Sequence, residues 1–390
     1  MTSGVNTVPL PLIPPTESIT TSPTPTLGPT AGYARWPRFG IELNGTPVTS
    51  PIGVNITTNN YSEPSRFEAT IALTNTEAET ITNLPSISVQ VYVSLDGYSS
   101  QTVFYGLIDT LEYDPIVGIL TFSGRDLAGL FMDTPTQLAE QNYTSSQVVE
   151  KFVQQQSAYG VKGDITQTTG LIGRYYQPMD YDFRIWGGNT YRATNEWDFM
   201  LFLAQHEGFD LRVEGQTLYF GPATSDTAPA YQIVVGNDQG VVATNVERLR
   251  LVRSLTLAKD VKVTVMSWQS FVMRPVERSV QSSQPGSPSG GYGPVQNYIF
   301  NKPDLTPEQA LATAKSLLKD ITVRERIIEV DMPGELTLNP SSRVNLSGTN
   351  TSWDQLYYID EITRSLSFGE GFKQHLRLKN HSSGTQTTVF

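Results

Sequence analysis

Polar and apolar residues alternate in short runs along much of this chain. The clearest run is 87–93, Ile-Ser-Val-Gln-Val-Tyr-Val, in which every second residue is apolar. Period-two alternation rich in β-branched residues predicts a half-buried strand. Similar runs fill 33–125 and are separated by turn signals such as Asn44-Gly45 and Asp114-Pro115. Short strands at such regular spacing favour a β-barrel or a β-sandwich.

Helical spacing replaces this alternation in the next part of the chain. Apolar residues recur at helical intervals over 144–159 and again over 196–206, and a glycine follows each run. Residues 209–220 return to alternation and predict a hairpin. Candidate helix caps are Ser145, Thr194 and Asn195. The segment 126–222 therefore predicts a small α+β domain.

Strands return over 223–382. This second β block is interrupted by 276–304, whose Gly-, Pro- and Ser-rich centre predicts a flexible loop. A helix is predicted over 306–320, because Thr306-Pro307 followed by Gln309 has the form of a capping box with proline at the first helical position. The runs that predict further strands are 246–252, 260–268, 325–332, 343–346, 357–368 and 372–378.

The two ends differ from the rest of the chain. Residues 1–32 are rich in Pro, Thr and Ser and predict an N-terminal arm, either disordered or ordered on a neighbouring subunit, and residues 383–390 predict a C-terminal tail. The fold class expected is mainly β with an α+β insert. The predicted order is a β-barrel domain over 33–125, the α+β domain over 126–222 and a second β-barrel domain over 223–382.

Composition narrows the possible functions. The 390 residues carry a formal net charge of −11, whereas a duplex-gripping protein needs Lys and Arg to displace phosphate counterions. The absence of cysteine excludes disulfides, thiolate metal sites and cysteine nucleophiles. We expect no membrane-spanning segment and no secretory signal, because no apolar run is long enough and the start lacks a basic n-region.

The supply of catalytic groups is thin. Nothing in the sequence pairs the three histidines as ligands, and neither a nucleophile elbow nor a phosphate-binding loop occurs. The three histidines are His206, His375 and His381. Asp180, Asp182 and Glu196 are a conceivable carboxylate set, but an acidic chain offers many such triples. We therefore expect no enzyme and assign no catalytic, metal or cofactor-binding residue.

Aromatic residues are spread through the chain. The tryptophans are Trp36, Trp186, Trp197, Trp268 and Trp353. The stretch from Tyr175 to Trp186 combines aromatic and polar residues, which suits a sugar-stacking surface, a subunit contact or core packing. Trp197, on a helical face, is most simply a core residue.

Several segments, taken in order, resemble one known family. Residues 122–133, Phe-Ser-Gly-Arg-Asp-Leu-Ala-Gly-Leu-Phe-Met-Asp, resemble the segment that closes the first barrel of phage baseplate hub proteins, the late-control-D-like and T4-hub-like proteins of contractile tails and related injection machines. Residues 194–220 resemble the helix and hairpin of that family, 307–320 its second-barrel helix, and 356–376 its closing hairpin. The Pro-rich segment 1–32 and the Tyr175–Trp186 stretch have no counterpart.

The resemblance implies a structural hub. It implies a homotrimer whose two tube-like β-barrels per chain form a quasi-sixfold ring between the sixfold tail tube and the trimeric spike. The implied partners are the tube and spike proteins, other baseplate proteins and possibly the tape-measure protein, with DNA passing without specific binding. The implied location is the virion, after assembly in the bacterial cytoplasm.

Two alternatives stay open at this point. The first is a carbohydrate-binding tail or adhesin module that uses its surface aromatics. The second is a cell-wall hydrolase that uses acidic residues such as Asp180, Asp182 and Glu196.

Overall fold

The computed structural model describes most of the chain, with gaps. The described residues are 37–59, 63–95, 100–136, 140–141, 143–172, 174–175, 195–222, 229–238, 241–254, 261–269, 273–282, 296–302, 305–322, 326–380 and 387–388. The predicted arm, most of the Tyr175–Trp186 stretch and most of the predicted tail lie outside them. No helix within these residues is long and apolar enough to cross a membrane.

The fold is mainly β with a helical insert, as predicted, and most strands belong to one 14-stranded sheet. In the first β block the strands are β1 (Arg38–Leu43), β2 (Thr46–Pro47), β3 (Pro51–Asn59), β4 (Arg66–Ala72), β5 (Ser88–Ser94), β6 (Gln101–Asp114) and β7 (Ile119–Asp126). In the second they are β13 (Tyr231–Asp238), β14 (Val241–Thr244), β15 (Arg248–Arg253), β19 (Arg326–Pro333), β20 (Arg343–Ser347), β21 (Leu356–Ser367) and β22 (Gly371–Asn380). The predicted strand 87–93 is β5, whose valines are fully buried.

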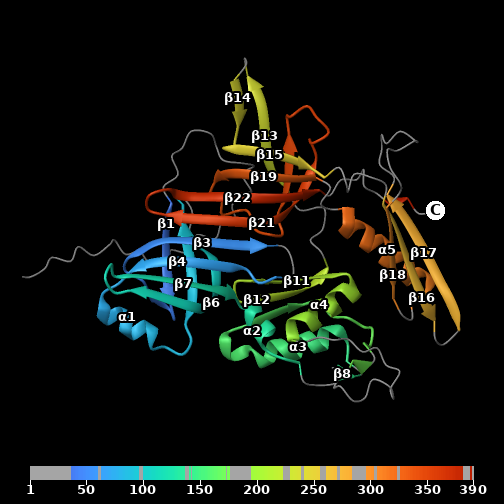
Figure 1. Ribbon diagram of the computed structural model, residues 1–390, viewed down its shortest axis with the longest axis horizontal. Coiled ribbons are helices and arrows are strands. Elements are labelled where there is room, and N and C mark those ends of the chain that lie inside the picture. Colours follow the sequence, from blue (N-terminus) through green and yellow to red (C-terminus); the bar gives the residue numbers. More distant parts are fainter. Residues whose placement is uncertain are drawn as a thin grey trace, which may run out of the picture.

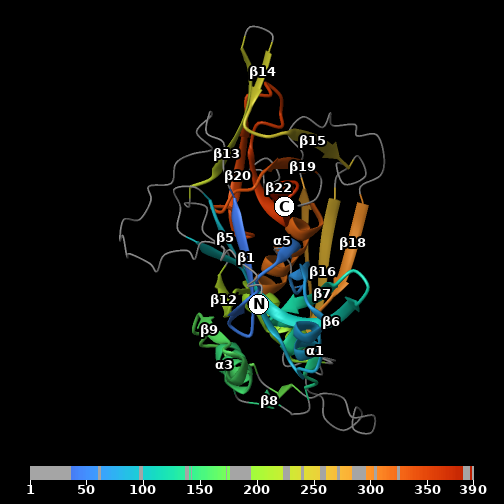
Figure 2. The same ribbon diagram turned by 90° about the vertical axis from the view of Figure 1, so that its left-hand side faces the viewer.

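The two β blocks are joined by direct strand pairing. β3 pairs antiparallel with β21, so that Asn55 faces Ser365 although the two residues are 310 positions apart in the sequence. Ile56 on β3 and Leu366 on β21 belong to the buried core of the first block, whereas Ile362 on β21 belongs to that of the second. Figures 1 and 2 show the second block stacked above the first. Closure of each block into a separate barrel stays a prediction.

The predicted α+β domain lies below the first block (Figure 1). Its helices are α2 (Ala128–Asp133), α3 (Ser145–Gln155), the 3-10 helix η1 (Ser157–Tyr159) and α4 (Glu196–Glu207). Its strands are β8 (Glu140–Gln141), β9 (Lys162–Ile165), β10 (Arg174–Tyr175), β11 (Phe209–Glu214) and β12 (Thr217–Pro222). The α-helices α2, α3 and α4 and the β11–β12 hairpin enclose one core around the fully buried Trp197.

The helix caps of this domain follow the sequence signals, with one correction. Asn195 caps α4 by accepting a hydrogen bond from the backbone N–H of Asp198, as predicted. The cap of α3 is Thr144, not Ser145. Thr144 forms a capping box with Gln147, whereas the Ser145 hydroxyl donates to Glu207 at 2.6 Å.

A fourth core lies within the second β block of the sequence. Here α5 (Pro307–Thr322) packs on a separate sheet of β16 (Val261–Gln269), β17 (Arg274–Ser282), β18 (Gln296–Asn301) and β23 (Thr387–Thr388). The predicted loop over 276–304 is wrong at both ends, which form β17 and β18. Its apolar residues alternate there: Val276 and Val280 on β17, and Tyr298 and Phe300 on β18, contribute to this core. The predicted capping box at the start of α5 is confirmed by reciprocal bonds between Thr306 and Gln309.

One helix was not predicted. α1 (Asn75–Thr82) follows β4 and begins at a capping box formed by Thr74 and Glu77. Among its residues Ala78 is buried. The helix is short and polar, so it lacks the apolar periodicity that marks the longer helices.

Candidate functional site at the junction of three cores

The structure places His375 in a surface pair. Its Nδ1 lies 2.6 Å from Asp331 Oδ1 on the neighbouring strand β19, and both side chains are about 40% exposed. The side chain of His206 and the whole of His381 lie outside the described residues. Among the residues with described positions, no three His, Asp or Glu side chains gather as a metal site would require. The pair with Asp331 is a cross-strand contact of the kind that stabilises sheets.

Of the conceivable carboxylate set, the structure describes Glu196. This residue begins α4 and is 4% exposed, and its Oε2 has no hydrogen-bond partner among the described residues. Burial raises the pKa of Glu196 to about 7, against a hydrogen bond from Gln156 and the charge of Lys151. Asp180 and Asp182 lie outside the described residues. The position of Glu196 against the core is a sufficient reason for its shifted pKa.

The tryptophans occupy three kinds of position. Trp197 packs against Phe131 in the α+β core, as expected. Trp353 lies beneath the guanidinium of Arg326, at 5.3 Å from the ring centre. Trp268 is 54% exposed on β16. Trp36 and Trp186 lie outside the described residues, and so do the side chains of the Tyr175–Trp186 stretch.

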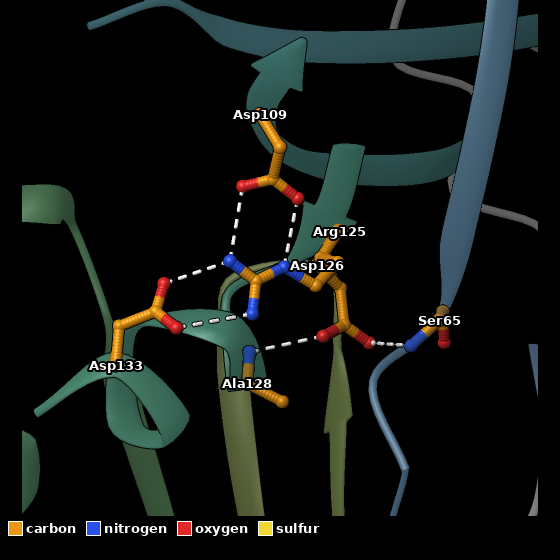
Figure 3. A network of polar contacts seen from close by, with 6 residues as sticks. All are labelled: Ser65, Asp109, Arg125, Asp126, Ala128 and Asp133. Atoms are coloured by element: carbon orange, nitrogen blue, oxygen red, sulfur yellow. Dashed lines mark hydrogen bonds and ion pairs between the residues drawn. The ribbon is translucent and has the colours of Figure 1, made fainter. Parts of the chain in front are cut away.

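The segment that carried the family resemblance joins the first block to α2. Arg125, near the end of β7, forms ion pairs of 2.7 Å with Asp109 on β6 and with Asp133 at the end of α2 (Figure 3). Both carboxylates receive two guanidinium hydrogen bonds, a geometry stronger than a single contact. The hydrogen bonds that Arg125 donates, first to Asp109 and then to Asp133, raise the pKa of Arg125 above its usual value. Arg125 therefore ties β6, β7 and α2 together.

The next residue, Asp126, points the other way and is 6% exposed. One oxygen accepts the backbone N–H of Ser65 at 2.8 Å, and the other accepts that of Ala128 at 2.9 Å (Figure 3). Burial raises the pKa of Asp126 to about 6, although these backbone bonds and Arg125 favour its charged form. Asp126 thus fixes both the start of α2 and the chain that enters β4.

Two glycines let the backbones approach closely beside this network. A Cβ on Gly124 would lie 1.9 Å from the carbonyl oxygen of Leu107, and one on Gly106 would lie 2.2 Å from that of Arg125. The pairing of β6 with β7 shifts register between Ile108 and Thr110, as at a β-bulge. Glycine is required at both positions because any side chain would collide with backbone.

A cavity of about 190 Å³ opens beside Asp126, where three parts of the chain meet. The first block, the turn of the β11–β12 hairpin and the loop that follows β19 all contribute to its wall. The residues that line it are Thr58, Asn59, Ser65, Gln101, Thr102, Val103, Phe104, Tyr105, Asp126, Arg212, Val213, Glu214, Gly215, Leu336, Leu338, Asn339, Pro340 and Arg364.

Arg364 is the charged residue that sequence reasoning missed. It lies on β21, is 5% exposed, and donates a hydrogen bond to the carbonyl oxygen of Leu338. Its inward neighbours Ile362 and Leu366 belong to the second and first cores respectively, so Arg364 marks the boundary between them. The sequence signal that could have found it is the position of Arg364 between Ile362 and Leu366, where the alternation predicts an apolar residue. The junction connects the cores of the chain but presents no nucleophile–base pair among the described side chains.

Comparison of the whole structure identifies the fold. The tail protein from Neisseria meningitidis MC58 is similar over 90% of this chain and 98% of its own, with a TM-score of 0.66 at 16% identity. The 43 kDa tail protein of prophage MuSo2 from Shewanella oneidensis is similar over 87% of this chain and 95% of its own, with a TM-score of 0.59 at 15% identity. The chain thus has the fold of phage tail proteins.

A secretion protein shares this fold. The E. coli protein c3393 is described as a component of the type VI secretion system with structural similarity to the T4 tail proteins gp27 and gp5. The similarity extends over 88% of this chain and 77% of c3393. The TM-score is 0.50 at 11% identity. No protein-family model matches the sequence, and no curated protein matches it. The predicted resemblance to hub proteins is therefore confirmed at the level of structure.

Proposed function

We propose that this chain is a structural component of the tip of a phage tail or a related injection machine, and that it is not an enzyme. The observation that carries this proposal is the similarity to tail proteins along nearly the whole of both chains. A match that includes the β blocks and the α+β domain supports a shared architectural role more strongly than a match to one domain would. The proposed location is the virion, after assembly in the host cytoplasm.

The finer proposal is a homotrimeric hub that adapts a sixfold tube to a trimeric spike. Two β blocks per chain give six similar units in three copies. Within the described residues, β2 and β14 end the strand order of the large sheet, and the β13–β14 hairpin projects from the top of the molecule (Figures 1 and 2). Unpaired strand edges are surfaces on which a second chain can continue a sheet, so they suit subunit contacts.

The proposed ring encloses a channel through which DNA passes. The net charge of −11 supports this proposal, because an acidic wall repels the phosphate backbone and so limits sticking. The proposed partners are the tail tube, spike and other baseplate proteins, with the tape-measure protein as a further candidate. The carbohydrate-binding alternative depends on the Tyr175–Trp186 stretch and stays a prediction.

Cryo-electron microscopy of the intact particle tests the proposal. We expect density for this chain at the tail tip, as one ring of three copies between the tube and the spike. Density for the chain on a peripheral fibre, or as single copies outside the central axis, would contradict the hub assignment.

A further inference from the structure

Arg364 is a buried charge without a counter-charge. Its guanidinium forms no ion pair with any described side chain, and its Nε has no hydrogen-bond partner there. Burial lowers the pKa of Arg364 to about 10, and no carboxylate within the described part of the chain opposes the effect. Buried charges in proteins are ordinarily paired, because removal of an ion from water is costly. Arg364 is therefore a buried cation for which the described residues supply no counter-charge.

A second buried donor lies beside it. Gln374 on β22 is the direct cross-strand partner of Arg364 and is 2% exposed. Its Oε1 accepts the backbone N–H of Glu335 at 2.9 Å, whereas its Nε2 has no hydrogen-bond partner among the described residues. Arg364 lines the cavity whereas Gln374 does not, so Arg364 is the donor that an oxygen-bearing anion in the cavity would meet.

The cavity beside Arg364 has room for such a ligand. Its volume of about 190 Å³ exceeds by far the roughly 10–15 Å³ that one water needs. Two acidic residues also line it, but both are engaged. Glu214 accepts from Arg212 at 2.7 Å, and Asp126 accepts two backbone N–H groups (Figure 3). Arg364 is thus the lining cation for which the described residues offer no carboxylate.

We propose that the junction cavity binds one carboxylate group from outside the chain, held by Arg364. The carboxylate would lie at the boundary between the two β cores and neutralise the buried guanidinium. A dissolved carboxylic acid and an acidic side chain of a bound protein share this chemistry. In either case binding would stabilise the junction of the first and second blocks, because the ligand contacts the native state alone.

Acetate is the probe for this site. The full chain is titrated with sodium acetate by calorimetry, and its Tm is followed against sodium chloride at equal ionic strength. We expect one site per chain and a rise in Tm of about 2 °C when acetate is tenfold above its Kd. Arg364→Met should lose both effects. This variant is expected to fold, because methionine fills similar volume and removes an unpaired buried charge.

One further variant sharpens the test. Arg250→Met removes an exposed arginine paired with Glu329 and should retain acetate binding unchanged. Equal Tm shifts in the wild type and Arg364→Met would reveal a general salt effect and overturn the site. Absence of acetate binding to the wild type, with water alone filling the cavity, would overturn it as well.

If acetate binds, a second titration distinguishes the sources. One titration uses a blocked peptide that contains one glutamate, and its control uses the same peptide with glutamine in that position. Together with the acetate titration they compare a side-chain carboxylate with a dissolved acid. Tighter binding of the glutamate peptide than of acetate assigns the site to a protein partner. Binding of acetate alone assigns it to a dissolved acid. A trimer without acetate binding would sink this inference but leave the proposed hub intact.

Discussion

Gly124 lies where β7 approaches the backbone of β6 so closely that no side chain fits between the two strands. A Cβ there would lie 1.9 Å from the Leu107 carbonyl oxygen, so Gly124→Ala must displace backbone. We expect a loss of about 1–3 kcal/mol in the free energy of unfolding, measured by denaturant titration. Gly170→Ala is the matched control, because a Cβ there meets nothing within 4 Å. Equal stability of the two variants would contradict the close approach.

Glu196 gives the chain a pH-dependent stability. Its pKa rises from 4.5 to about 7 on folding, so the folded state binds the proton more tightly. The stabilisation is complete below pH 4.5 and is lost as pH rises through 7. Glu196→Gln should therefore be more stable than the wild type at pH 8, by about 1–3 kcal/mol, with a gain that shrinks towards pH 5.

Thermal unfolding of both proteins between pH 5 and pH 8 measures this difference. The exposed Glu308, in the first turn of α5, supplies the control Glu308→Gln. That variant should follow the wild type at every pH. A gain for Glu196→Gln that does not change with pH would show that the carboxyl does not titrate in this range.

For single residues, the sequence predicts a role where the interacting residues are close together in the chain. Gly124, Arg125 and Asp126 stand in one recognisable segment, and the structure brings them together as a network. Arg364 could not be assigned in the same way, because its burial is created by β3, β22 and the loop after β19. Its alternation with Ile362 and Leu366 shows which face it occupies but not what covers that face.

The pairing of β3 with β21 is the element-scale feature that holds the two β blocks together. Ser365 lies in the middle of β21 and pairs with Asn55 on one side and Lys373 on the other. Ser365→Pro would remove a backbone donor from a central strand, where proline is not tolerated. We expect a fall in Tm, with hydrogen exchange accelerated along β3 and β21.

Ser365→Ala is the matched control for this substitution. It retains the backbone N–H and changes a half-buried side chain, so it should stay within about 0.5 kcal/mol of the wild type. Slow exchange that persists along β3 in Ser365→Pro would show that the two blocks do not depend on this pairing.

Local signals predicted most elements, and their failures have physical causes. The capping box at Thr306 correctly placed the start of α5, and the same signal at Thr74 marks α1, which was overlooked for want of apolar periodicity. β17 and β18 flank a Gly- and Pro-rich stretch, whose composition dominated the interpretation of 276–304. The pairing of β3 with β21 leaves no mark in one sequence, because cross-strand partners are chosen by the whole fold.

The charge of the whole molecule predicts its behaviour towards DNA. With a net charge of −11, the chain should not shift the mobility of double-stranded DNA in a gel-shift assay at physiological salt. Lower salt strengthens phosphate contacts, so a titration down to 50 mM salt is the stringent form of the test. Salt-dependent DNA binding at nanomolar protein concentration would contradict the proposal that DNA passes through the channel without binding to its wall.

The mass of the particle in solution tests the proposed assembly most directly. Each chain has a mass of 43.0 kDa. Size-exclusion chromatography with multi-angle light scattering should give three times this mass for the purified protein at micromolar concentration, because ring formation covers the open sheet edges. A trimer that persists on dilution is the predicted result. A stable monomer across the same concentrations would contradict the hub.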